Sequence, residues 1–139
     1  MSLDPTAGRR WLAVGGGSPV EIRAAAGLLV VGGLLFVITD LLWLAIDGGD
    51  TAQLLVVPLL QLAIGIGVAG GLIRGSRIAR YVGLVFTLTF ALLHMLFALQ
   101  DGPILIRILT GVIAASQIYA AVLLNTRPAL DHTGARGRR

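Results

Sequence analysis

The sequence predicts an all-α integral membrane protein in which four transmembrane helices form one bundle. Hydrophobic residues make up 56% of the 139 residues and charged residues 13%, whereas soluble proteins average about 45–50% and about 25%. The mean hydropathy is +0.89. Four stretches are long and apolar enough to cross a bilayer core about 30 Å thick, which takes about 20 helical residues. A soluble domain of this length could not bury so much apolar surface, so we expect lipid to cover it.

The spans differ in the ionisable groups that they carry. Their expected bounds are residues 24–46, 51–73, 81–100 and 104–126. The first span contains one charged residue, Asp40, and the second contains none. The third contains His94, and the fourth contains Arg107 close to its start. Such isolated polar groups in apolar helices are candidates for a functional role.

Cap and turn residues separate the spans. Ser18 and Pro19 are typical of a helix start, so the first helix should begin near residue 19. Residues 47–50 and 101–103 consist of Asp, Gly and Pro and predict two tight turns. The expected organisation is a short N-terminal segment 1–18, a four-helix membrane domain 19–127 and a basic tail 128–139.

The arginines predict the orientation of the spans. Ten of the eleven precede the first span, fill the middle loop or lie in the tail: Arg9, Arg10, Arg23, Arg74, Arg77, Arg80, Arg127, Arg136, Arg138 and Arg139. The two opposite turns contain no Arg and three Asp. Because cytoplasmic loops carry the excess of basic residues, we expect both termini in the cytoplasm. This topology accounts for the net charge of +4 without a nucleic-acid partner.

The basic residues also indicate a source. All eleven are Arg and none is Lys, which is typical of a GC-rich bacterial genome. We therefore expect a multi-pass protein of a bacterial plasma membrane, with the lipid bilayer as its first partner.

An offset of 54 residues indicates an internal repeat. It aligns Phe36, Asp40, Trp43, Asp47 and Gly48 with Phe90, His94, Phe97, Asp101 and Gly102. The shared spacing predicts two tandem helical hairpins related by an axis along the membrane normal. Asp40 and His94 would then lie at equivalent depths, each about 10 Å from its own outer Asp.

Asp40, His94 and Arg107 form the expected intramembrane polar cluster. An ionised group inside the hydrocarbon costs about 2.5–3.5 kcal/mol on insertion scales, so such groups are rarely idle. Three interpretations remain open at this point. The cluster is a proton or ion relay, or a polar clamp in which Asp40 pairs with Arg107 and His94 bonds to Thr39, Thr87 or a carbonyl. Alternatively, Arg107 extends toward the interface and pairs with Asp101 or Asp47.

Other polar and small residues predict helix packing. Gln61 and Gln117 lie near the membrane centre, where they are expected to form hydrogen bonds between helices. Two pairs of small residues at i and i+4 would let helix backbones approach closely: Gly67 with Gly71, and Gly111 with Ala115. They would pack either inside the bundle or against another protein chain.

Several classes of site are not expected. The chain has no Cys, which excludes disulfides, thiolate metal sites and cysteine nucleophiles. It has two His. There is no H-E-x-x-H, P-loop or dinucleotide-binding motif. We therefore expect no enzymatic activity, no metal and no cofactor.

Two functions remain compatible with the sequence. The first is a non-enzymatic accessory or scaffold subunit that packs against itself or a larger membrane complex through its glycine-rich faces. The alternative is a small oligomeric transporter or channel, proton-coupled, that uses Asp40 and His94.

Overall fold

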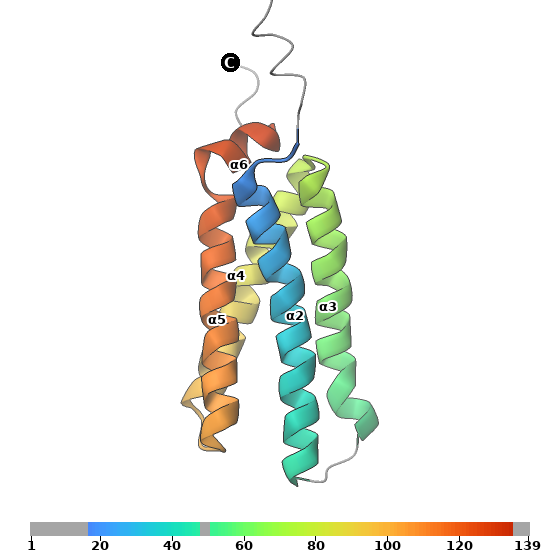
Figure 1. Ribbon diagram of the computed structural model, residues 1–139, viewed down its shortest axis with the longest axis vertical. Coiled ribbons are helices and arrows are strands. Elements are labelled where there is room, and N and C mark those ends of the chain that lie inside the picture. The colour runs from blue at the N-terminus through green and yellow to red at the C-terminus, as the bar shows by residue number, and fades with distance from the viewer. Residues whose placement is uncertain (1–16, 48–50, 135–139) are drawn as a thin grey trace, which may run out of the picture.

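The computed structural model describes residues 17–47 and 51–134 and shows four long helices with a short fifth helix across one end (Figure 1). The helices are α2 (Val20–Asp47), α3 (Thr51–Ile73), α4 (Arg77–Leu99), α5 (Ile104–Leu124) and α6 (Arg127–His132). Each of α2 to α5 contains a stretch long and apolar enough to cross a membrane. The predicted all-α class with four membrane-spanning helices is therefore confirmed.

The four long helices form a closed ring in chain order. Helix α2 packs against α3 and α5, and α4 packs against the same two helices. Most large apolar side chains point away from this ring, for example Val85 and Leu99, which are 67% and 70% exposed. An outward apolar surface and a narrow interior are what a lipid-embedded bundle requires, because the bilayer replaces water around it.

The helix ends follow the local sequence signals. Helix α2 begins at Val20, close to the predicted start. Ser76 caps α4 by accepting a hydrogen bond from the backbone N–H of Ala79 at 3.3 Å. Gly75 precedes this cap with φ of +77°, a conformation that favours glycine. The predicted turn around 101–103 joins α4 to α5, whereas Gly48, Gly49 and Asp50 of the other turn and most of segment 1–18 lie outside the described residues.

Helix α6 covers the end of the bundle where α2 begins (Figure 1). It begins at Arg127, the last residue of the predicted membrane domain, and continues into the segment 128–139 that the sequence indicated only as a basic tail. Ala129 is fully buried in a core cluster with Ile22 and Leu124. The His132 ring nitrogen Nε2 lies 3.3 Å from the carbonyl oxygen of Ile73 at the end of α3. Helix α6 therefore ties together elements from both halves of the chain.

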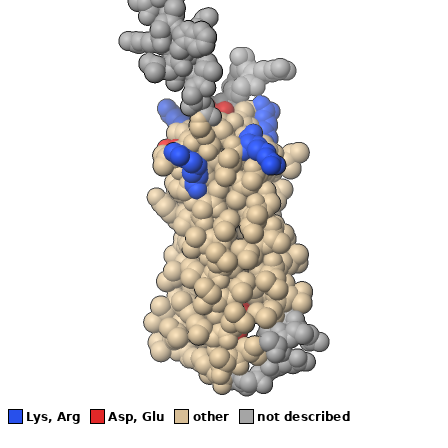
Figure 2. All heavy atoms as spheres, turned by 45° about the vertical axis from the view of Figure 1, so that its right-hand side comes forward, with Lys and Arg blue, Asp and Glu red and all other residues tan. Residues whose placement is uncertain are grey.

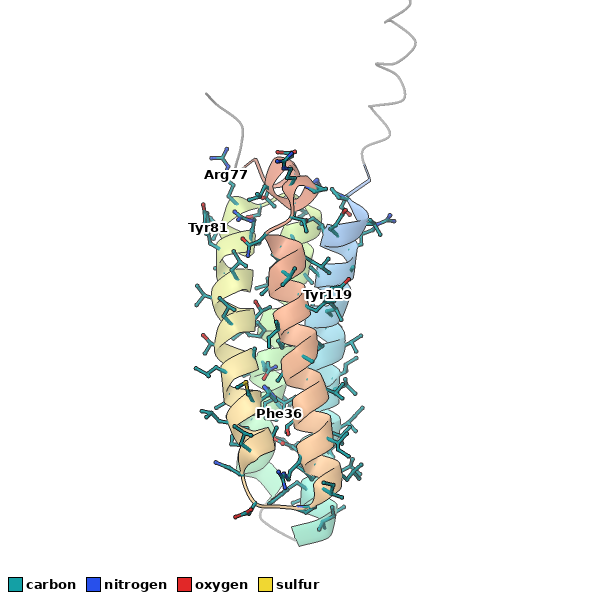
Figure 3. All side chains as sticks on the ribbon, turned by 90° about the vertical axis from the view of Figure 1, so that its left-hand side faces the viewer. Phe36, Arg77, Tyr81 and Tyr119 are labelled. Atoms are coloured by element: carbon teal, nitrogen blue, oxygen red, sulfur yellow. The ribbon has the colours of Figure 1, made fainter. Side chains whose placement is uncertain are left out.

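Basic side chains gather at the α6 end. Figure 2 shows them as a group above a wide uncharged surface, and Figure 3 shows Arg77 and Tyr81 on the outer side of α4 there. Arg80 is different because it is only 6% exposed. Its Nε donates a hydrogen bond to the carbonyl of Leu124 at 3.0 Å, which satisfies a free carbonyl in the last turn of α5.

Candidate functional site

A cavity of about 370 Å³ lies inside the end of the bundle opposite α6. Helices α2, α3, α4 and α5 and the turn between α4 and α5 all contribute to its wall, in the region around Phe36 in Figure 3. Its lining residues are Phe36, Thr39, Asp40, Trp43, Val57, Leu93, Phe97, Gln100, Asp101, Gly102, Ile106, Arg107 and Thr110. Volumes of about 300–1,000 Å³ are typical of small-molecule sites.

Asp40 is the acidic group furthest from the ends of the helices in this cavity. It lies on α2, about two turns before the end of that helix, and its side chain is half-buried. The nearby wall residues Phe36 and Thr39 are 6% and 2% exposed, so Asp40 lies between a closed interior and a more open rim. Asp101 and Gly102 belong to that rim and are exposed.

Arg107 lines the same cavity but is engaged elsewhere. Its Nε donates a hydrogen bond to the carbonyl of Ala98 at 3.1 Å, in the last turn of α4. Among residues 17–47 and 51–134, the structure contains no ion pair between Arg107 and Asp40 or Asp101. The Asp40–Arg107 pair of the polar-clamp interpretation is therefore not formed in the described residues, whereas the expected bond from His94 to a carbonyl is. A helix C-terminus leaves its last carbonyls without partners, and they compete with carboxylates for a guanidinium.

His94 lies beside the cavity and not in its wall. Its side chain is fully buried on α4, and its Nδ1 donates to the carbonyl of Phe90 at 2.7 Å, since a carbonyl can only accept. The Phe36 ring contacts the imidazole edge-on with centroids 4.6 Å apart. Phe36 also lines the cavity, so its ring contacts both the imidazole of His94 and the space next to Asp40. The Nε2 atom of His94 has no hydrogen-bond partner in the described part of the chain.

Gln61 and Gln117 lie deeper in the bundle and are almost fully buried, at 1% and 0% exposure. The predicted hydrogen bonds between helices are not formed, since both amide nitrogens and both amide oxygens lack a partner among the described residues. The Gln117 amide lies so close to Gly32 of α2 that a Cβ there would overlap it. Unpartnered amides in an apolar interior are costly, so this arrangement needs an explanation.

Three threonines add buried hydroxyl groups near the cavity and His94. Thr39 and Thr87 were expected as possible partners of His94, which bonds to the Phe90 carbonyl instead, and Thr110 was not expected. Thr39, Thr87 and Thr110 are buried, and each donates its hydroxyl proton to a carbonyl of its own helix at 2.8 to 3.1 Å. Thr39 and Thr110 line the cavity. Their hydroxyl oxygens keep lone pairs that can accept further hydrogen bonds. For Thr39 and Thr110 the available signal was a Thr within one turn of a charged residue, Asp40 and Arg107 respectively.

The small residues that were expected at helix contacts lie partly inside the bundle and partly on its outer face. Gly71 packs against Ala79 of α4. Gly67 and Gly111 have no heavy atom of another element within 4 Å of the place that a Cβ would occupy, and Ala115 is exposed. Gly33 of α2 also lies close to another helix, since a Cβ there would lie 3.0 Å from Leu62 of α3.

Comparisons with protein-family models, curated proteins and solved structures found no match. Across residues 17–47 and 51–134, no group of three or more His, Cys, Asp or Glu could hold a metal ion. The cavity and the polar residues around it are therefore the features of the described residues that indicate a function.

Proposed function

We propose that the protein is a small proton-coupled membrane transporter that binds its solute in the cavity beside Asp40. The observation that carries the proposal is a half-buried carboxylate in a cavity of about 370 Å³ inside four apolar helices. A charged group at such a position is costly and marks a solute or ion pathway in many membrane proteins. Arg107, the cationic side chain among the described lining residues, bonds to the Ala98 carbonyl and forms no ion pair with Asp40.

Buried polar groups beyond the cavity support transport more than simple binding. His94 Nε2 and the amides of Gln61 and Gln117 provide five polar atoms without partners in the interior. Ordered water commonly satisfies such atoms and can extend a polar route through a bundle. Together with Asp40, these residues supply donors and acceptors from the cavity end toward the middle of the helices.

Proton flux into proteoliposomes provides the test. Vesicles containing the purified protein and a trapped pH-sensitive dye are energised with a potassium diffusion potential. We expect faster acidification than in protein-free vesicles and loss of the difference in Asp40→Asn. Asp131→Asn is the matched control, because Asp131 is an exposed carboxylate on α6. Equal flux in protein-containing and protein-free vesicles would contradict proton-coupled transport.

A second candidate function is an accessory subunit of a larger membrane complex or a homo-oligomer. It is favoured by the uncovered small-residue face of α3, where Ala63 and Gly67 are exposed and nothing contacts the Cβ position of Gly67 or Gly70. Such faces allow another helix to pack closely. Extraction in a mild detergent followed by mass spectrometry tests this function. A stoichiometric partner lost in Gly67→Leu would support it, and a bare monomer would contradict it.

We also propose that both termini lie in the cytoplasm of a bacterial cell and that α2–α3 and α4–α5 are tandem copies of one hairpin. The arginines at the α6 end, including Arg23, Arg74, Arg77 and Arg127, support this orientation. Fusion reporters test it. A green fluorescent protein at the C-terminus should fluoresce, and alkaline phosphatase inserted at Gly102 should be active. The reverse pattern would contradict the orientation.

A further inference from the structure

We propose that the cavity beside Asp40 binds a monovalent organic cation that carries an apolar group. The inference rests on the proposed function, because it names the class of solute for that site. Three features of the wall indicate this class of solute: its formal charge, its aromatic rings and the distribution of its polar and apolar residues.

The charge of the wall favours a cation. Two carboxylates, Asp40 and Asp101, and one guanidinium, Arg107, give the lining a formal charge of −1. The guanidinium is held by the Ala98 carbonyl on one side, whereas Asp40 has no ion-pair partner among the described residues. A positive group next to Asp40 would complete the pairing that buried charges require.

The aromatic rings favour an organic cation over a metal ion. Phe36, Trp43 and Phe97 all line the cavity, and aromatic faces attract ammonium groups, most strongly when water is excluded. Trp43 lies over the turn between α4 and α5, where its ring would be 3.6 Å from a Cβ at Gly102. Hard metal cations instead need several oxygen ligands around one point, and the walls between the carboxylates are mainly apolar.

The apolar residues of the wall explain why the cation should carry an apolar group. The rim holds Asp101 and Gln100, which are exposed, whereas the walls include Leu93, Ile106 and Val57. A small hydrated ion would leave these apolar walls in contact with its water. An alkyl or aryl group would cover them while the charged end lies beside Asp40.

The native absence of cysteine makes a direct test possible. A Leu93→Cys variant has one thiol in the cavity wall, and Leu96→Cys has one on the exposed face of the same helix. A methanethiosulfonate reagent that needs water to reach a thiolate should modify the first and not the second. The reaction is then repeated with phenyltrimethylammonium, with its neutral isostere tert-butylbenzene, and with benzenesulfonate.

We expect phenyltrimethylammonium to slow modification of Leu93→Cys by about tenfold at saturation, with little effect of the other two compounds. The protection should be lost in the Asp40→Asn background and kept in Asp40→Glu. Protection by the neutral compound or by benzenesulfonate, or by none of the three compounds, would contradict a cationic solute. It would leave the result of the proton-flux experiment unaffected. Absence of modification without any compound would show a cavity closed to water and would overturn the site itself.

Discussion

Arg80 and Arg107 form reciprocal links between the two antiparallel helices α4 and α5. Each is the fourth residue of its own helix. Arg80 Nε donates to the carbonyl of Leu124 at the end of α5, and Arg107 Nε donates to the carbonyl of Ala98 near the end of α4. Each cation thus lies at the negative end of the partner helix, where it stabilises unpaired carbonyls.

The first prediction concerns these links. Arg80→Gln should lower the free energy of unfolding by about 1.5–3 kcal/mol, the range for a hydrogen bond to a charged group. Arg80 is the stronger case because it is buried, and Arg107→Gln should cost less because Arg107 is half-buried. Thermal unfolding in detergent measures both. Arg77→Gln is the control, since Arg77 is exposed; an equal loss in that variant would argue against the links.

The second prediction contrasts two glycines. Gly33→Ala should destabilise the bundle by about 1–3 kcal/mol because its Cβ would meet Leu62 of α3 at 3.0 Å. Gly67→Ala should be neutral or stabilising by up to about 1 kcal/mol, since its Cβ would meet nothing within 4 Å and Ala favours helix. Midpoints of thermal unfolding provide the comparison. A loss of stability in Gly67→Ala, measured on the purified monomer, would contradict this packing of the ring formed by the four helices α2, α3, α4 and α5.

The third prediction concerns the central amides. Gln61→Leu and Gln117→Leu should leave stability unchanged or raise it, because the amides have no hydrogen-bond partner to lose. If they form part of the solute route, the same variants should reduce proton flux. Unfolding midpoints and vesicle flux are measured on the same preparations. A clear loss of stability in either variant would indicate a hydrogen bond that this conformation lacks.

The fourth prediction separates the packing of His94 from its chemistry. His94→Phe should retain the fold, since the imidazole lies among the rings of Phe36, Phe90 and Phe97. His94→Ala should cost about 2–4 kcal/mol by leaving a void in the interior. Flux should fall in both variants if the buried Nε2 takes part in transport. Normal flux in a folded His94→Phe variant would assign His94 a structural role only.

The spans and turns could be predicted from sequence because their causes are local. Apolar length fixes α2 to α5, and the residues around Pro19 and Gly102 mark their ends. The partner of Arg107 could not be predicted, because sequence gives the depth of a side chain but not which carbonyl or carboxylate it meets. Helix α6 was missed since Arg127 and Pro128 mark both a stop and a new start. The contrast between Gly67 and Gly71 depends on where α4 packs after the short turn at Gly75.

The two ends of the bundle differ mechanically. At one end α6 lies against α2 and α5, His132 reaches the end of α3, and Arg80 joins α4 to α5. At the other end Arg107 likewise joins α4 to α5, but within the described residues no helix crosses the helix ends, and the cavity lies there. A small tilt of α2 or α3 about the α6 end would therefore displace the cavity end of that helix more than the end held by α6. Such a tilt would change the volume of the cavity without unpacking the α6 end.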